Sequence, residues 1–181
     1  KGYSATGEKV DVTMTEDAEP SNTQTVSADV ESDGSWTARL APMTAGTSPY
    51  TITIADGTSA APVVLENVLV GDVFLAAGQS NMNYEAPNSA DSKDNLGDTS
   101  SGYYKKGMYE KQLQCASDMI RIFKMYQSGS GTETFDVPIA MDWRSSSDAT
   151  NGVINILSLS SLGAFFAKNV VEEGIPVGII Q

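Results

Sequence analysis

Apolar and polar residues alternate in short runs along the first 69 residues of the chain. Such alternation is typical of β-strands that bury one face and expose the other to water. The runs cover residues 10–14, 25–30, 35–40 and 50–54. Asp33-Gly34, Ala45-Gly46 and Asp56-Gly57 lie between or after these runs and favour tight turns, because glycine adopts a positive φ without steric penalty. We therefore expect residues 1–69 to form an antiparallel β-sandwich module.

The pattern changes from residue 70 onward. Residues 73–77 are apolar at every position, as a central parallel strand covered on both faces requires. Two further apolar runs, 119–125 and 177–180, are separated from it and from each other by intervals long enough for crossover connections. Residues 70–181 are therefore predicted to form an α/β domain with a parallel sheet, and the fold class of the whole chain is mixed.

One helix is predicted over residues 159–173. Apolar side chains recur there near helical spacing, at Leu162, Phe165, Phe166, Val170 and Val171. Serines at 158, 160 and 161 offer N-cap hydroxyls, and Gly174 with Pro176 ends the helix. A helix followed directly by the 177–180 strand is half of a β-α-β unit, which supports the α/β prediction.

Composition and charge exclude some classes of partner. The chain has 181 residues, of which 40% are hydrophobic, and its formal net charge is −12. Such a charge repels phosphate backbones and anionic bilayers, so we expect no nucleic-acid partner and no membrane insertion. No stretch approaches the roughly 20 apolar residues that cross a bilayer. The first ten residues lack the apolar core of a secretory signal, so any signal is expected to have been removed.

Three single residues could belong either to the core or to a site, and two of them are interpreted as core residues. Cys115 is the only cysteine, so it makes no internal disulfide and no Cys-rich zinc site, and we expect a free buried thiol. Trp36 is more typical of a sandwich core than of a sugar-stacking platform. Trp143 falls in a stretch expected to overhang the sheet edge, and both a core role and a site role stay open for it.

Ser80 is the strongest candidate for chemistry. It follows the 73–77 run within Gly78-Gln79-Ser80-Asn81-Met82, and the carboxyl edge of a parallel sheet is where open α/β folds bind ligands. Gly78 would let the chain turn sharply, and a turn or helix after Ser80 would point N–H groups at a developing oxyanion. On these residues alone, a polar turn without chemistry is the alternative. The GxSxG elbow of α/β-hydrolases is disfavoured, because Met82 occupies its final glycine position.

Residues 70–82 resemble the serine motif of SGNH-type carbohydrate esterases, specifically the sialate O-acetylesterase family. The resemblance covers nearly the whole chain. Upstream, residues 33–36 and 49–54 look like the family's leading β-sandwich module. Downstream, the similar segments are 120–123, Trp143, 161–166 and 174–180. The resemblance implies that residues 70–181 are the first part of a flavodoxin-like parallel-sheet hydrolase domain.

The resemblance also implies an activity. A protein of this kind is a serine hydrolase that removes O-acetyl groups from carbohydrates, either sialic acid or acetylated polysaccharide, through an acyl-Ser80 intermediate and without a metal or organic cofactor. The Ser80 amide would donate to the oxyanion, together with a glycine just after the strand that ends here at Gln181 and a side-chain amide farther on. Gly78, Gln79 and Asn81 would support the loop. A secreted, periplasmic or cell-surface location is implied as well.

The chain departs from this family because it contains no histidine. A serine hydroxyl needs a base, normally an imidazole oriented by a carboxylate, and in the family both lie beyond a point equivalent to Gln181. We therefore expect this chain alone to be inactive and to be completed by the remaining part of the same protein or by a second chain. Three parallel strands would otherwise leave an apolar sheet edge that invites pairing. A degenerate, non-catalytic carbohydrate-binding or surface protein is the alternative.

Two other polar clusters are disfavoured as sites. Lys105 and Lys106 could replace the imidazole only if burial depressed a lysine pKa, and their polar surroundings within a long surface loop argue against it. Asp91, Asp94 and Asp98 invite a calcium site, but their spacing fails the Asp-x-Asp-x-Asp-Gly pattern. We interpret the aspartates as a solvated acidic loop and expect no metal.

Overall fold

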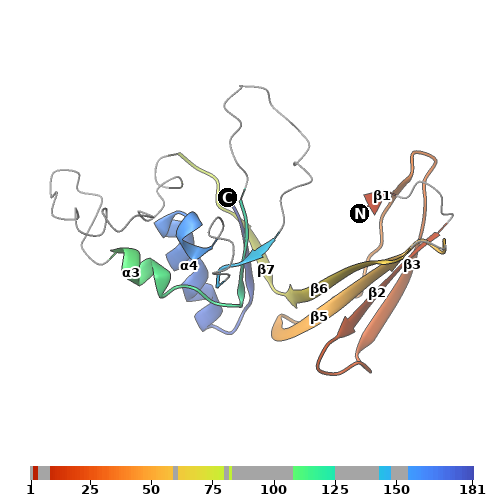
Figure 1. The fold of residues 1–181 in the computed structure, drawn as a ribbon, viewed down its shortest axis with the longest axis horizontal. Helices are drawn as coiled ribbons and strands as arrows, with labels where there is room; N and C mark the ends of the chain where they lie inside the picture. The colour runs from red at the N-terminus through yellow and green to blue at the C-terminus, as the bar shows by residue number, and fades with distance from the viewer. Residues whose placement is uncertain are drawn as a thin grey trace. The chain divides into compact units, whose positions relative to one another are not determined.

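The structure is a computed structural model, and it describes residues 2–3, 9–58, 61–79, 82, 108–124, 143–147 and 155–181. The chain divides into two compact units, Lys1–Val70 and Gly71–Gln181. The first is built on an antiparallel four-stranded sheet and the second on a mostly parallel four-stranded sheet with few helices (Figure 1). At this level the mixed fold class expected from the sequence is confirmed.

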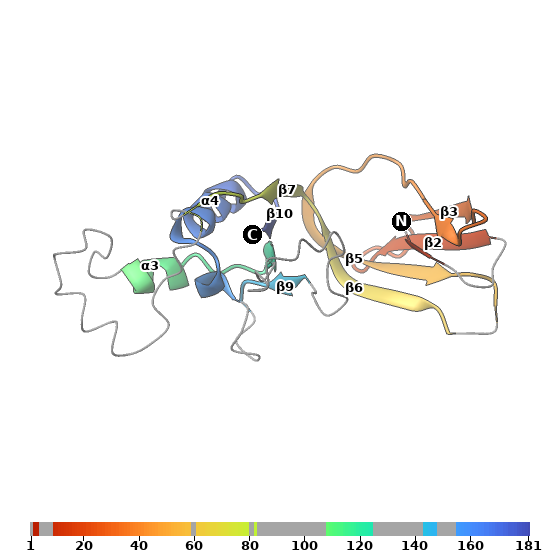
Figure 2. The same ribbon diagram turned by 90° about the horizontal axis from the view of Figure 1, so that it is seen from above.

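The first unit is an antiparallel sheet with one buried face. The sheet has the order β3-β2-β5-β6 (Figure 2), with strands β2 (Lys9–Glu16), β3 (Thr23–Asp29), β5 (Gly46–Ala55) and β6 (Val63–Val70). A two-stranded ribbon pairs β1 (Gly2–Tyr3) with β4 (Ser35–Trp36). Trp36 from this ribbon is 8% exposed and packs with Val10, Val12 and Ala28 of the sheet. Its predicted role as a core residue is therefore confirmed.

Alternation predicted strands β2, β3 and β5, but one predicted strand is shorter than expected and one predicted turn is wrong. The expected 35–40 run is a strand only over Ser35–Trp36, and the Ala41 amide instead donates to the Gln24 side chain at 2.8 Å. Ala45-Gly46 is not a turn, because Gly46 begins β5. Gly34 and Gly57 do adopt the positive φ expected of turns, at 83° and 71°.

The second unit is a sheet with helices packed on one face. Its order is β7-β10-β8-β9, in which β7, β10 and β8 run parallel and β9 is antiparallel to β8. The strands are β7 (Asp72–Leu75), β8 (Ile120–Phe123), β9 (Arg144–Ser145) and β10 (Val177–Ile180). The helical elements that the structure describes in full are α3 (Met108–Leu113), the 3-10 turn η2 (Ile156–Ser158) and α4 (Ser161–Glu172). Apolar side chains of β8 and β10 form the core with Ala164 and Ala167 of α4.

Helix α4 confirms the predicted helix, with a later start. Ser160 is the N-cap, and its hydroxyl accepts from the Gly163 amide at 3.0 Å. The helix begins after residue 160 because Ile156–Ser158 forms a separate 3-10 turn and Leu159 is extended. Gly174 follows the helix with a φ of 82°, as expected for the residue that ends it.

Strand β7 differs from its prediction within the described sheet. The sequence predicts a central strand, but among the described strands β7 lies at one edge and β10 lies inside. Phe74 packs on Phe166 of α4, with ring centroids 4.9 Å apart. Val73 and Leu75 point to the opposite face and are 61% and 67% exposed. Over its described surroundings, β7 is therefore covered on only one face, although every position of this run is apolar.

Candidate active site

The structure describes only part of the predicted serine segment. Gly78 and Gln79 are described, whereas Ser80 and Asn81 lie outside the described residues. The lysines and aspartates considered between residues 91 and 106 also lie outside them. The site is therefore built from the residues that flank Ser80 in the sequence and from the elements that they contact.

The carboxyl ends of three parallel strands meet at one edge of the second unit's sheet. Ile180 of β10 is in register with Leu75 of β7 and with Phe123 of β8. The ladder continues one step further, because the Ala76 amide donates to Ile180 at 2.7 Å and the Gln181 amide donates to Phe123 at 3.0 Å. The segment that leads to Ser80 thus leaves the sheet beside Gln181, at the edge where open α/β folds bind ligands.

A tight turn follows this segment. The Met82 amide donates to the Gln79 carbonyl at 3.0 Å, and Met82 is helical. A Cβ on residue 78 would lie 2.8 Å from Met82 Cγ, so a larger residue there would displace the Met82 side chain. Gly78 is not among the described glycines with positive φ. Close packing by Met82 therefore favours glycine at this position, and the support of the serine loop by Gly78 stays a prediction.

Ser160 joins the turn to the helix and to strand β10. Its side chain is fully buried, and its hydroxyl lies 3.6 Å from Met82 Sδ while it caps α4. The Ser160 amide donates to Gln181 Oε1 at 2.8 Å. Ser160 is one of the three serines expected as possible caps, and Gln181 is expected as a strand end. Their contacts to each other and to Met82 have no signal in the sequence.

The segment before α4 is held by a buried glutamine. Gln112 of α3 is 0% exposed, and its Nε2 donates to the carbonyls of Ile156 and Leu159, both at 2.9 Å. Its Oε1 accepts from the Ser161 hydroxyl at 2.7 Å. Every polar atom of this side chain therefore has a partner: two carbonyls of the segment that leads into α4 and the hydroxyl of the first residue of α4. Nothing in the sequence pattern marked this residue.

Lys124 holds the same segment from the sheet. It follows β8, and its Nζ donates to the Ser158 carbonyl at 2.6 Å. Partial burial lowers the pKa of the Lys124 ammonium below its ordinary value. Gln112 and Lys124 together bond three of the four carbonyls of the 156–159 segment, those of Ile156, Ser158 and Leu159, and so hold that segment beside the carboxyl edge.

Trp143 lies over the face of the sheet rather than beyond its edge, which corrects the expectation. A Cβ on Gly178 would lie 3.0 Å from Trp143 Cζ3, and the Trp143 and Phe123 rings are 5.5 Å apart. Val177 and Ile179 face α4, so Gly178 and Trp143 lie on the opposite face. Trp143 is 45% exposed there, on the same face as Val73.

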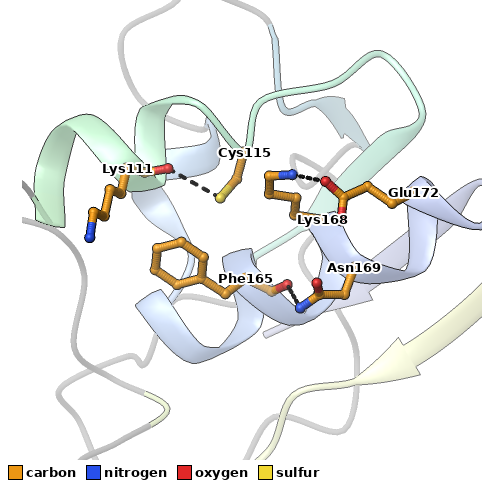
Figure 3. Close-up of polar contacts among 6 residues, drawn as sticks. All are labelled: Lys111, Cys115, Phe165, Lys168, Asn169 and Glu172. Carbon is orange, nitrogen blue, oxygen red and sulfur yellow. Dashed lines mark hydrogen bonds and ion pairs between the residues drawn. The ribbon is translucent and has the colours of Figure 1, made fainter.

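Cys115 is buried between α3 and α4, as predicted (Figure 3). Its side chain is 2% exposed, and its thiol donates to the Lys111 carbonyl at 3.3 Å. Lys168 and Glu172 of α4 form an ion pair beside it. Burial raises the pKa of the Cys115 thiol. The charges of Lys168 and Glu172 have smaller effects that oppose each other, because Lys168 lowers this pKa and Glu172 raises it. A neutral, inert thiol is the result.

We expect Cys115 to react with a thiol reagent at least about tenfold more slowly in the native chain than in guanidinium chloride. Because its pKa is higher in the folded state, the unfolded state loses its proton first as pH rises. Its contribution to stability is therefore present below the unfolded pKa and is lost above roughly pH 8.5. Denaturant melts of the parent and of Cys115→Ala between pH 7 and pH 10 measure this. Parallel pH dependence of the two proteins would contradict it.

Within the described residues, no helix is long and apolar enough to span a bilayer. In the same part of the chain, no three His, Cys, Asp or Glu side chains are grouped so as to hold a metal ion.

No family model matches the chain, and no curated protein matches it. Five chains of solved structures do match, and the similarity indicates an esterase-related fold. One of these structures is a carbohydrate acetylesterase from Xanthomonas citri, which matches with a TM-score of 0.64 and 25% sequence identity over 99% of this chain. The match covers 34% of that enzyme, so this chain spans about a third of its length.

Proposed function

We propose that this chain is the first part of a serine esterase that removes O-acetyl groups from carbohydrates. The observation that carries the proposal is the Gln79–Met82 turn, which follows parallel strand β7 at the carboxyl edge of the sheet. Near-complete alignment of the chain with part of a carbohydrate acetylesterase supports it. In this proposal residues 1–69 are a leading β-sandwich module, and residues 70–181 begin an SGNH-type, flavodoxin-like hydrolase domain.

The proposed reaction proceeds through an acyl-enzyme. The Ser80 hydroxyl attacks the acetyl carbonyl while a base takes its proton, and the oxyanion that forms is stabilised by backbone N–H groups including that of Ser80. The bond between the carbonyl carbon and the sugar oxygen then breaks, and the sugar oxygen leaves as a hydroxyl by taking the proton from the base. Water hydrolyses the acetyl-serine in the same way and releases acetate. Gly78, Gln79 and Asn81 shape the loop, and no metal or organic cofactor takes part.

The base must come from outside these 181 residues, because the chain contains no histidine. We propose that the remaining part of the protein, or a second chain from the same precursor, supplies it and extends the sheet at β7. The edge position of β7 in the described sheet supports an added strand, and the exposed Val73 and Leu75 side chains support a layer that covers that face. The one-third coverage of the acetylesterase also supports this partner. The family resemblance and the acidic composition support a periplasmic, cell-surface or secreted location for the protein.

Acetate release tests the proposal. The coding sequence past Gln181 should contain an Asp-x-x-His segment, and the longer protein should release acetate from an acetylated sugar and from an aryl acetate. The absence of histidine favours a second candidate, a non-catalytic carbohydrate-binding protein of the same fold. Binding of acetylated sugar without any acetate release, by a longer protein that carries the segment, would support that candidate instead. Activity of the 181-residue chain alone would contradict the proposed division of the site.

Charge on the open face of β7 should block completion of the sheet. The double change Val73→Asp and Leu75→Asp affects side chains that are 61% and 67% exposed, so the 181-residue chain should lose little stability. When the chain is co-expressed with the downstream segment, recovered acetate release should fall at least about tenfold, because burying two carboxylates is strongly unfavourable. Val64→Asp, at a 48% exposed position in the first unit, is the control and should leave recovery unchanged. Equal recovery with all variants would exclude this face as the docking surface.

A further inference from the structure

We propose that Met82 is a positioning residue for the nucleophile. Its side chain holds the Gln79–Met82 turn against the buried N-terminus of α4 and so fixes the two ends of the turn between which Ser80 lies in the sequence. This inference rests on the proposed function, and it adds a role for a residue outside the reacting groups.

The first observation is the contact on the side of the turn that leaves β7. Met82 Cγ and Cβ approach residue 78 so closely that an added Cβ there would lie 2.8 and 3.2 Å from them. The Met82 amide closes the turn on the Gln79 carbonyl at 3.0 Å. Main chain and side chain of Met82 therefore both hold the residues that immediately precede Ser80.

The second observation is the contact on the opposite side of Met82. The Ser160 hydroxyl accepts from the Gly163 amide at 3.0 Å, and it lies 3.6 Å from Met82 Sδ, to which it can donate its proton. Ser160 is 0% exposed, so water does not replace this acceptor. A thioether is a weak acceptor, but it is long and adaptable enough to reach from the turn to a buried hydroxyl.

The third observation is that Ser160 itself is fixed. Its amide is bonded to Gln181 Oε1 at 2.8 Å, which ties it to the end of β10. The preceding carbonyl of Leu159 is held by Gln112 at 2.9 Å, and that of Ser158 by Lys124 at 2.6 Å. Met82 thus contacts a segment, residues 158–160, that is bonded both to helix α3 through Gln112 and to the sheet through Lys124. Catalytic groups act efficiently only when such supporting contacts hold them in place.

A cysteine reporter tests this in the 181-residue chain, where no base is needed. Ser80→Cys places a thiol at the nucleophile position, and its pKa is read from the pH dependence of iodoacetamide alkylation, resolved by mass spectrometry. N–H groups arranged for an oxyanion should lower that pKa by about one unit from the ordinary ~8.5. Cys115 is 2% exposed and reports general unfolding in the same experiment.

Met82→Ala in this background should raise the reporter pKa by about one unit and slow alkylation at pH 7 by roughly threefold. The rate falls less than the thiolate population does, because a thiolate with a higher pKa is the stronger nucleophile. Met82→Leu keeps the packing on Gly78 and should restore at least half of the shift. Ser160→Ala removes the same contact from the other side and should raise the pKa too, which keeps the test decisive if Met82→Ala fails to fold. Met119→Ala, at a partly buried methionine at the other end of β8, is the control and should change nothing.

The outcomes separate the two proposals. An ordinary reporter pKa in the parent contradicts the inference, whereas the proposed function fails only if the longer protein releases no acetate. A lowered parent pKa that Met82→Ala and Ser160→Ala leave unchanged contradicts the inference alone. Faster Cys115 labelling with an unchanged reporter pKa would assign Met82 a purely structural role and would also overturn the inference.

Discussion

Replacing Ser80 with alanine is expected to lower kcat/KM for acetyl ester hydrolysis by about 10³-fold or more in the longer protein that carries the base. The hydroxyl supplies the bond that forms in the transition state, so kcat should fall as far as kcat/KM while substrate binding changes little. Residual hydrolysis comes from oxyanion donors and binding alone. Initial rates with an aryl acetate and with an acetylated sugar give both constants.

Ser147→Ala is the matched control for this change. Ser147 is exposed in the same unit, and its side chain can be removed without loss of a buried contact, so activity should stay within about twofold of the parent. A Ser80→Ala enzyme that retains most of the parental kcat would remove the nucleophile from the proposal. Equal losses in Ser80→Ala and Ser147→Ala would indicate damage to the fold instead of chemistry.

Local pattern predicted those elements whose residues decide their own conformation. Strand β2 follows from alternation because Val10, Val12 and Met14 bury one face, and α4 follows from the serine cap and from Gly174. The exceptions have partners that are distant in the sequence. Residues 37–40 alternate as a strand should, yet among the described residues no strand pairs with them beyond Trp36. The edge position of β7 follows from strand order, which residue periodicity does not encode.

In the candidate site, too, features set by neighbouring residues could be predicted from the sequence, and contacts between distant residues could not. The motif around Ser80 and the position of Gly78 after β7 could be inferred from the sequence, because they lie within a few residues of each other. The contact between Met82 and Ser160 joins residues 78 positions apart. Gln112 is separated by 44 to 49 positions from the three groups that it bonds. A glutamine on a short helix has no local feature that distinguishes it from a solvated one, so only the folded chain reveals this role.

Gln112→Leu is therefore expected to be among the most destabilising single changes in the second unit. Leucine is similar in size but leaves the buried Ile156 and Leu159 carbonyls and the half-buried Ser161 hydroxyl without their partner at a position where Gln112 is 0% exposed. Each buried group left unsatisfied costs about 1–3 kcal/mol, so a loss of roughly 3 kcal/mol or more in the free energy of unfolding is expected. For a unit of about 100 residues this lowers Tm by at least ~10 °C.

The two tryptophans allow this loss to be assigned to one unit. Trp36 lies in the first unit and Trp143 in the second, so fluorescence melts in a Trp36→Phe background follow the second unit alone. Gln114→Leu makes the same chemical change two residues away at an exposed position and should shift the melt by less than about 0.5 kcal/mol. The large effect of Gln112→Leu should extend to Ser80, because the segment that Gln112 holds carries Ser160, and Ser160 holds Met82. Equal melts for the two glutamine variants would mean that the 156–161 segment is held by other contacts, and the rigid support inferred for the nucleophile turn would lose its basis.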